Sequence, residues 1–168
     1  NGTLTLEIHY TTNGEEQTDR TEMAFYLADG PQERQGETRS AITNDLDIPP
    51  GESDARHLAT YAFKKPATIY GLFPHMHFRG KWMRYELLLP NGKRETLLHV
   101  PRYDFQWQLS YNLKKPLHVP AGAWLMVTGS FDNSVNNPNN PDPTRRVVFG
   151  QQAWDEMFIG FFEAADDP

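Results

Sequence analysis

The chain has 168 residues, which is enough for one domain with a sizeable core. It carries 16 Lys and Arg against 22 Asp and Glu, and the resulting net charge of −6 argues against a protein that tracks nucleic-acid phosphates. No apolar run approaches the roughly 18 residues that a membrane-spanning helix needs. The absence of cysteine excludes disulfides, thiolate zinc sites, iron–sulfur clusters and blue copper, so any metal would be held by His, Met, carboxylate or backbone oxygen.

Short apolar runs rich in aromatic and β-branched residues, separated by 13 Pro and 12 Gly, predict an all-β fold. We expect a single domain over residues 1–168, a sandwich of two antiparallel sheets with about 8–10 strands. Residues 3–10 alternate between apolar and polar side chains and predict the first strand. The other predicted strands cover 22–28, 57–63, 67–78, 82–89, 95–100, 106–111, 123–131, 146–149 and 157–163. Asn91-Gly92 between two of them predicts a hairpin turn.

Two polar stretches predict irregular structure. Residues 30–50 are expected to form a loop with a short strand. Residues 132–144 contain three prolines, each of which would remove a hydrogen-bond donor from a ladder, so they cannot form the interior of a strand. Oxygen atoms of Asp132 and Asp142 could clasp Ca²⁺, and a plain turn-rich loop is the alternative.

The sequence His75-Met76-His77 is the first candidate for chemistry. On a strand, residues i and i+2 project from the same face, about 6.5 Å apart along the backbone, so the two imidazoles could converge on one metal ion. Neutral imidazole is a suitable ligand for copper, zinc, iron or nickel. The alternative is that the two histidines are polar residues on a solvated strand face.

Two single residues are further candidate ligands. Met157 stands at the entrance of a predicted strand, and its thioether is a soft donor that favours Cu(I); core packing is the alternative role for it. His9 is predicted to face away from the apolar stripe of its strand, where it is either a ligand or a solvated side chain. The adjacent acids Asp155 and Glu156 are interpreted as solvated turn residues.

Several short motifs follow one another along nearly the whole chain. They are Leu6-Glu7-Ile8-His9-Tyr10, Ile48-Pro49-Pro50-Gly51, His75-Met76-His77-Phe78-Arg79-Gly80, Asn91-Gly92 and Asp155-Glu156-Met157. Their order and spacing resemble the copper type II, ascorbate-dependent monooxygenases, the family of peptidylglycine α-hydroxylating monooxygenase and dopamine β-monooxygenase. Members of that family have two jelly-roll β-sandwich domains with one copper each. The chain is similar to the second, C-terminal domain alone, and its Asn- and Pro-rich loop points to a bacterial relative.

The resemblance implies a ligand set. His75 and His77 match the two histidines of the oxygen-activating copper, and Met157 matches its methionine ligand. His9 matches the last histidine of the other, electron-donating copper. The histidine pair that completes this second site is absent from the chain, so the resemblance makes His9 a remnant ligand.

Three positions depart from the peptide-hydroxylating members of the family. Phe73 stands where they have an arginine, Ile159 where they have an asparagine, and Phe161 where they have a tyrosine. The polar groups that would bind a peptide carboxylate are therefore replaced by apolar ones. The resemblance therefore implies the copper site but does not imply a peptide substrate.

By resemblance, the chain is the mononuclear copper domain of a monooxygenase that uses O₂ to hydroxylate a C–H bond of a small organic substrate. Hydroxylation consumes two electrons, so we expect the second to come from an upstream or separate copper domain, with ascorbate as the external reductant. The isolated chain, a monomer by default, should bind copper and turn over poorly. Copper and O₂ chemistry favours a periplasmic or secreted location.

Two other functions stay open at this point. One is a non-catalytic copper-binding or electron-transfer module, which would use the same ligands without a substrate. The other is a metal-free jelly-roll domain that binds carbohydrate or another protein.

Overall fold

The structure is a computed structural model that describes residues 3–6, 8, 10, 13–27, 29–30 and 35–168. Contacts divide the chain into two compact units, residues 1–33 and residues 34–168. The second unit carries all the strands of the described residues: β1 (Glu37–Thr43), β2 (Asp47–Ile48), β3 (Ala55–Ala62), β4 (Ala67–His75), β5 (Gly80–Leu88), β6 (Arg94–Val100), β7 (Tyr111–Val119), β8 (Trp124–Phe131), β9 (Val147–Val148) and β10 (Phe158–Asp166). The described residues contain no helix that could serve as a membrane span.

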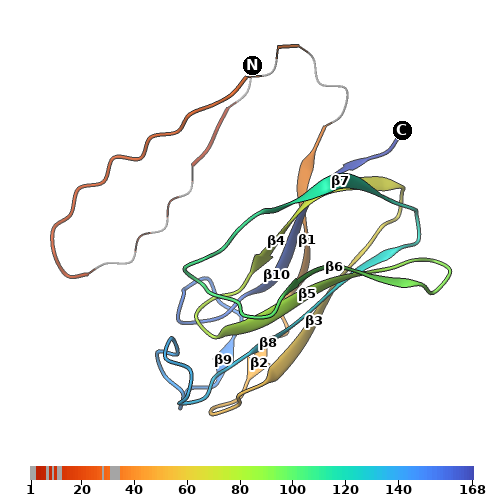
Figure 1. The fold of residues 1–168 in the computed structure, drawn as a ribbon. Coiled ribbons are helices and arrows are strands. Elements are labelled where there is room, and N and C mark those ends of the chain that lie inside the picture. The colour runs from red at the N-terminus through yellow and green to blue at the C-terminus, as the bar shows by residue number, and fades with distance from the viewer. Residues whose placement is uncertain (1–2, 7, 9, 11–12, 28, 31–34) are drawn as a thin grey trace. The chain divides into compact units, whose positions relative to one another are not determined.

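Two four-stranded antiparallel sheets form the two layers of residues 34–168 (Figure 1). One sheet has the strand order β1-β10-β4-β7, and the other has the order β3-β8-β5-β6, while β2 and β9 pair with each other. This architecture confirms the predicted all-β sandwich of antiparallel sheets. The finer jelly-roll class stays a prediction.

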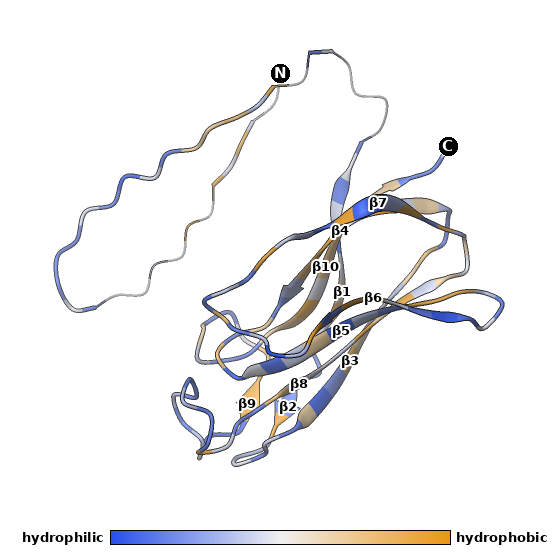
Figure 2. Ribbon diagram, in the orientation of Figure 1, coloured by the Kyte–Doolittle hydropathy of each residue, from blue (hydrophilic) through white to orange (hydrophobic). Residues whose placement is uncertain are grey.

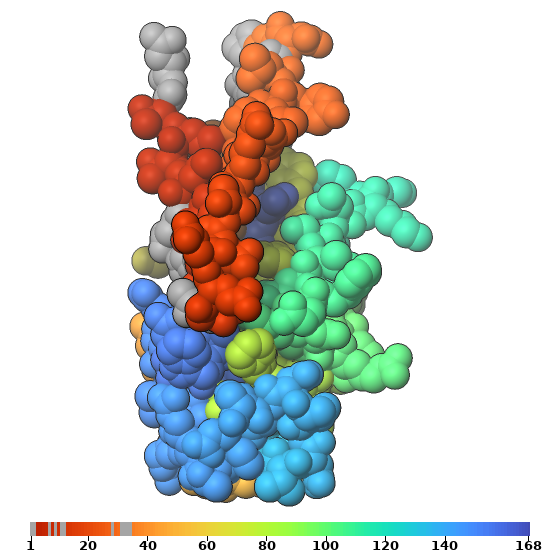
Figure 3. Space-filling view, turned by 90° about the vertical axis from the view of Figure 1, so that its left-hand side faces the viewer, coloured from red at the N-terminus to blue at the C-terminus, as the bar shows by residue number. Residues whose placement is uncertain are grey.

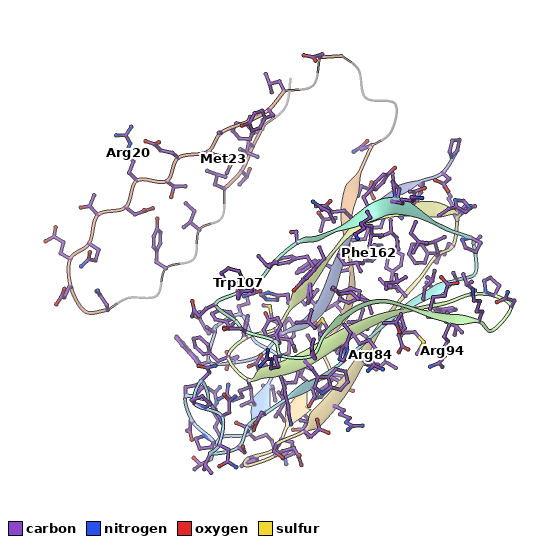
Figure 4. All side chains as sticks on the ribbon, in the orientation of Figure 1. Arg20, Met23, Arg84, Arg94, Trp107 and Phe162 are labelled. Atoms are coloured by element: carbon purple, nitrogen blue, oxygen red, sulfur yellow. The ribbon has the colours of Figure 1, made fainter. Side chains whose placement is uncertain are left out.

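The core lies between the two sheets and is built from alternate residues of their strands. Leu72 of β4 and Phe162 of β10 point inward from one sheet, and Tyr85 of β5 and Val127 of β8 point inward from the other. Figure 2 shows apolar residues recurring along these strands. Phe162 is 1% exposed, whereas Trp107, on the loop that precedes β7, is 70% exposed. Both residues are labelled in Figure 4.

Most of the predicted strands are found, with ends that differ by a few residues. The ranges 57–63, 67–78, 82–89, 95–100, 123–131, 146–149 and 157–163 correspond to β3, β4, β5, β6, β8, β9 and β10. The predicted hairpin turn at Asn91-Gly92 also forms, because the Gly92 N–H donates to Leu89 O and the Leu89 N–H to Lys93 O. Gly92 has a positive φ of 83°, which glycine adopts without strain.

The strand predicted over 106–111 is wrong, because residues 106–110 form the loop before β7 and only Tyr111 belongs to that strand. The real strand was missed because it contains Lys114-Lys115-Pro116. Pro116 is tolerated because β7 is an edge strand and because the β4–β7 register shifts between Ile69 and Gly71, so the missing N–H removes no ladder bond there. The polar residues of β1 likewise form a full edge strand beside β10, where only a short strand was expected.

The described residues of the ranges 3–10 and 22–28 form no strand, which corrects two further predictions. Within residues 1–33, Asn13-Gly14 forms a turn, and the Tyr10 hydroxyl donates to Asp19 Oδ2 at 2.7 Å. The alternating apolar side chains, Leu4 and Leu6 among them, are exposed. Alternation alone does not make a strand, because a strand also needs hydrogen-bonded partners and an isolated hairpin is marginally stable.

Residues 132–144 are a compact loop of consecutive turns, as expected from their prolines. Asn133 is fully buried, and its amide nitrogen donates to Pro49 O and Arg145 O. Asn137 and Asn140 bond to backbone carbonyls of the same loop. The loop forms part of the lower end of the unit in Figure 3. Its side-chain amides are thus used to hold the loop together.

Candidate functional site

His75 is the last residue of β4, and His77 follows it in the turn that leads to β5. Leu72 faces the core, so the alternation of β4 places His75 on the outer face of the sheet, where it pairs with Ile159 of β10. The centroids of the two imidazole rings lie 5.2 Å apart and their planes are nearly perpendicular, at 88°. The structure therefore brings together the two histidines that the sequence singled out.

Each imidazole is oriented by a hydrogen bond at Nδ1. His75 Nδ1 lies 2.8 Å from Gln108 Oε1, and the orientation of this amide is fixed because Gln108 Nε2 donates to Phe105 O at 3.0 Å. His77 Nδ1 lies 3.3 Å from the carbonyl oxygen of Asp155. Both partners are acceptors, which favours the proton on Nδ1 of each ring and makes Nε2 the nitrogen that could bind a metal. A second partner of this kind is typical of metal-binding histidines.

The surroundings of both histidines favour the neutral form of the imidazole. Burial lowers the pKa of His75 despite the hydrogen bond to Gln108. Burial also lowers the pKa of His77, and the neighbouring His75 lowers it further. Because a metal competes with protons for imidazole nitrogen, neutral rings favour metal binding at neutral pH.

We expect Gln108→Leu to release the ring of His75 without unfolding the chain. The leucine cannot accept the Nδ1 proton, so His75 should populate the Nε2–H tautomer, which ¹⁵N NMR of the ring detects. The affinity for a bound metal ion should fall by about 10- to 100-fold, as for other lost partners of metal ligands. Gln106→Leu, on the same loop but exposed, is the matched control. An unchanged tautomer in Gln108→Leu would contradict the assignment.

The turn that carries the two histidines is held by Tyr103. The Met76 N–H donates to the Tyr103 hydroxyl at 2.9 Å, and that hydroxyl donates to Met76 O at 2.7 Å. Gly80 makes room for this ring, because a Cβ there would lie 2.6 Å from Tyr103 Cδ1 and 2.9 Å from Met76 Cβ. The glycine of the His-x-His-x-x-Gly motif thus serves the packing of the turn.

Glu156, in the segment just before β10, holds the same turn. Its carboxylate accepts the His77 N–H at 2.8 Å and the Arg79 N–H at 2.6 Å, one at each oxygen. The side chain is 0% exposed, so its interpretation as a solvated turn residue is wrong. Burial raises the pKa of Glu156, while the two N–H donors and the guanidinium of Arg79 oppose this rise by stabilising the carboxylate. Asp155 is also partly enclosed and pairs with Arg145.

Arg79 is the buried cation beside this carboxylate. Its Nε donates to Asn133 Oδ1 at 2.9 Å, and its Nη1 donates to the carbonyl oxygen of Trp154 at 2.9 Å. The side chain is fully buried. Arg79 therefore connects the histidine turn to the loop after β8 and to the segment before β10.

Met157 lies at the point where β10 begins. The β4–β10 ladder pairs Ile159 with His75, and extension of this register predicts Met157 opposite His77. The preceding residue, Glu156, bonds to the backbone of His77, so the two segments are held together at this level. In the described part of the chain, no three His, Cys, Asp or Glu side chains are grouped to hold a metal. Met157 stays the predicted third ligand.

Three other histidines, His57, His99 and His118, lie on other strands. His9 falls outside the described residues. His57 packs against Phe131, with ring centroids 5.6 Å apart, and His118 pairs with Asp167. His99 stacks edge-on against Trp82.

An apolar surface adjoins His75 on the outer face of the sheet. The ring of Phe161 lies 6.0 Å from His75 and 6.0 Å from Phe73, and the two phenylalanine rings are nearly parallel. Ile159 lies between Phe161 and the start of β10 on the same face. These are the three positions at which the sequence departs from peptide-hydroxylating relatives, and the structure brings them together beside His75.

Sequence reasoning missed four residues that position the histidines: Arg79, Tyr103, Gln108 and Glu156. Arg79 and Glu156 lie within the motifs that the sequence singled out, but neither was given a positioning role. A charged residue directly beside a strongly apolar strand is a signal that burial could have been expected. Tyr103 and Gln108 lie in a loop that the sequence assigned in part to a strand, so nothing pointed to them.

No family model matches the sequence, and no curated protein matches it.

Proposed function

We propose that this chain is the mononuclear copper domain of a monooxygenase, with copper held by His75, His77 and Met157. The single observation that carries the proposal is the pair of adjacent imidazoles, with ring centroids 5.2 Å apart and each Nδ1 next to an acceptor oxygen. Two imidazoles and a thioether form a neutral, soft donor set, which fits Cu(I) better than zinc, magnesium or calcium.

Copper in this position would supply the redox chemistry with which O₂ attacks a C–H bond. The residues of the chain would position the copper ligands. Gln108 and the Asp155 carbonyl orient the imidazoles, and Tyr103 and Glu156 fix the turn between β4 and β5. Because these partners are in place before the metal arrives, little reorganisation is needed on binding.

Phe73, Phe161 and Ile159 would hold the apolar part of a substrate next to His75. An apolar surface excludes water there and offers no partner to a carboxylate, so an anionic end would lose its hydration without compensation. We infer that the substrate is a small organic molecule that presents a C–H bond of an apolar segment to the metal.

The second electron of each turnover has to come from outside this site. We propose a second copper domain, upstream or separate, with ascorbate as the external reductant, and a periplasmic or secreted location. His9 is proposed as a remnant ligand of that second site. These points rest on the resemblance of the sequence motifs.

We also infer a jelly-roll connectivity. The short strands β2 and β9 are left out, and the remaining long strands are counted in chain order. The first then pairs with the last (β1 with β10) and the second with the seventh (β3 with β8). The third pairs with the sixth (β4 with β7), and the fourth pairs with the fifth (β5 with β6). Such nested pairing is what supports a rolled-up double Greek key.

X-ray absorption of the chain loaded with one equivalent of Cu(I) tests the proposed ligand set. We expect two imidazole nitrogens and one sulfur around copper, and loss of the sulfur shell in Met157→Ile because isoleucine has no donor atom. Met126→Ile is the matched control, since Met126 is half-buried on β8 of the other sheet. Copper that binds without sulfur, or that does not bind in stoichiometric amount, would overturn the proposal.

A further inference from the structure

The outer face of the β1-β10-β4-β7 sheet is interrupted next to Gly71. The β10–β4 ladder shifts register between Glu163 and Ala164, and the β4–β7 ladder shifts between Ile69 and Gly71. Two irregularities thus meet at one place in the middle of the sheet. Bulges and strand glycines of this kind often mark positions where a ligand approaches the backbone.

A hollow of about 70 Å³ lies at this interruption. Its lining includes Gly71, Phe73, Ser110, Asn112, Phe161 and Glu163. A second, wider hollow of about 300 Å³ adjoins it and shares Thr38 and Glu163. The hollow therefore has apolar aromatic walls at one end and polar side chains at the other.

Two acceptor oxygens converge on the space above Gly71. A Cβ at this residue would lie 3.2 Å from Asn112 Oδ1 and 3.4 Å from Glu163 Oε2. In the part of the chain that the structure describes, no hydrogen bond or ion pair engages either side chain. A carboxylate and an amide oxygen side by side attract a positively charged N–H donor and repel an anion.

The aromatic wall leads from this hollow to the histidine pair. Phe73 and Phe161 line the hollow, and the ring of Phe161 lies 6.0 Å from the ring of His75. Gly71 and His75 are four positions apart on β4, which corresponds to about 13 Å of strand. A molecule bound at Glu163 could therefore extend along the phenylalanines to the candidate metal site.

We propose that this hollow binds the ammonium end of an elongated, mainly apolar amine whose carbon chain lies along Phe73 and Phe161 towards His75. The inference rests on the proposed function, because it makes the amine the substrate of that site. Glu163 supplies the charge, Asn112 supplies a second acceptor, and Gly71 supplies the space. The stacked phenylalanines bury the methylene groups.

Binding of three six-carbon probes to the metal-free chain tests the proposal. Hexylammonium, hexanol and hexanoate share the carbon chain and differ only in the end group, and ¹⁵N-detected NMR titrations give their Kd values. We expect hexylammonium to bind about tenfold more tightly than hexanol, because its hydrogen bonds are charge-assisted, with hexanoate the weakest. Nuclear Overhauser contacts should join the hexyl methyl group to the ring of Phe161.

Two variants locate the binding site. Glu163→Gln should weaken hexylammonium binding about tenfold and leave hexanol unchanged, because the charge is lost and the shape is kept. Glu86→Gln, on the central strand β5 of the other sheet, is the matched control and should change nothing. Gly71→Ala should weaken all three probes, since its methyl group occupies the space between Asn112 and Glu163. Equal affinities for the three probes, or an unchanged Kd in Glu163→Gln, would overturn the proposal.

The titrations need no copper, so this inference and the proposed function can fail separately. If hexylammonium binds as expected and Cu(I) does not bind, the amine site stands and the metal assignment falls. If Cu(I) binds as expected and the three probes do not differ, the metal site stands and the amine is excluded as its substrate.

Discussion

The Glu156→Ala variant is expected to lose about 3–5 kcal/mol of its free energy of unfolding, the range typical of a broken buried charge network. The alanine leaves the N–H groups of His77 and Arg79 without acceptors, and it leaves the buried guanidinium of Arg79 without its neighbouring carboxylate. Unpaired buried donors and charges each carry a desolvation cost. Urea denaturation of the metal-free chain measures the loss.

The Glu156→Gln variant keeps the shape of the side chain but replaces one acceptor oxygen with an amide nitrogen, so it tests the two contributions separately. One side of the amide carries N–H donors, so at least one of the two backbone N–H groups faces another donor, and part of the stability should be lost. Cu(I) affinity should fall in both variants, because the turn that carries His77 is no longer fixed. Glu86→Gln is the control for removal of a strand carboxylate. Wild-type stability in Glu156→Ala would show that the carboxylate does not hold the turn.

The Phe158→Ala variant is expected to lose about 3–5 kcal/mol as well, in this case from a cavity in the core. Phe158 is fully buried, and its ring packs against Phe131 at a centroid distance of 6.0 Å. Gly129 leaves the space for this ring, since a Cβ there would lie 2.6 Å from Phe158 Cε2. Thermal and urea unfolding report the change.

Phe161→Ala provides the comparison on the same strand. Phe161 lies on the outer face and is only partly buried, so its truncation removes fewer contacts and should cost less. Because Phe158 follows Met157 directly, Phe158→Ala should also loosen the start of β10. Equal losses in the two variants would contradict the placement of Phe158 in the core.

The sequence predicts strands with an alternating apolar face better than the polar edge strands β1 and β7. Alternating apolar residues indicate which side of a strand faces the core, and this pattern predicts β3, β4, β5, β8 and β10. β1 and β7 are edge strands with polar residues, and pairing with β10 and β4, rather than their own composition, makes them strands. The same dependence on a partner explains why the described residues of the range 3–10 form no strand despite their alternation.

The candidate site is predicted in part for a related reason. His75 and His77 are only two residues apart, so the end of β4 and the turn that follows it are enough to keep the two rings close together. The acceptors at their Nδ1 atoms come from Gln108 and Asp155, which are 33 and 78 residues away in the chain. Glu156 is buried only because backbone groups of His77 and Arg79 reach it. The sequence pattern around each of these residues gives no information about such distant partners.

The edge strand β7 also affects how copies of the protein meet. Lys114, Lys115 and Pro116 are consecutive and exposed on it. A second molecule that added a strand at this edge would bring lysines close to lysines and would find no N–H at the proline. Growth of the site-bearing sheet from chain to chain is therefore blocked along β7, so concentrated protein should resist aggregation through this edge.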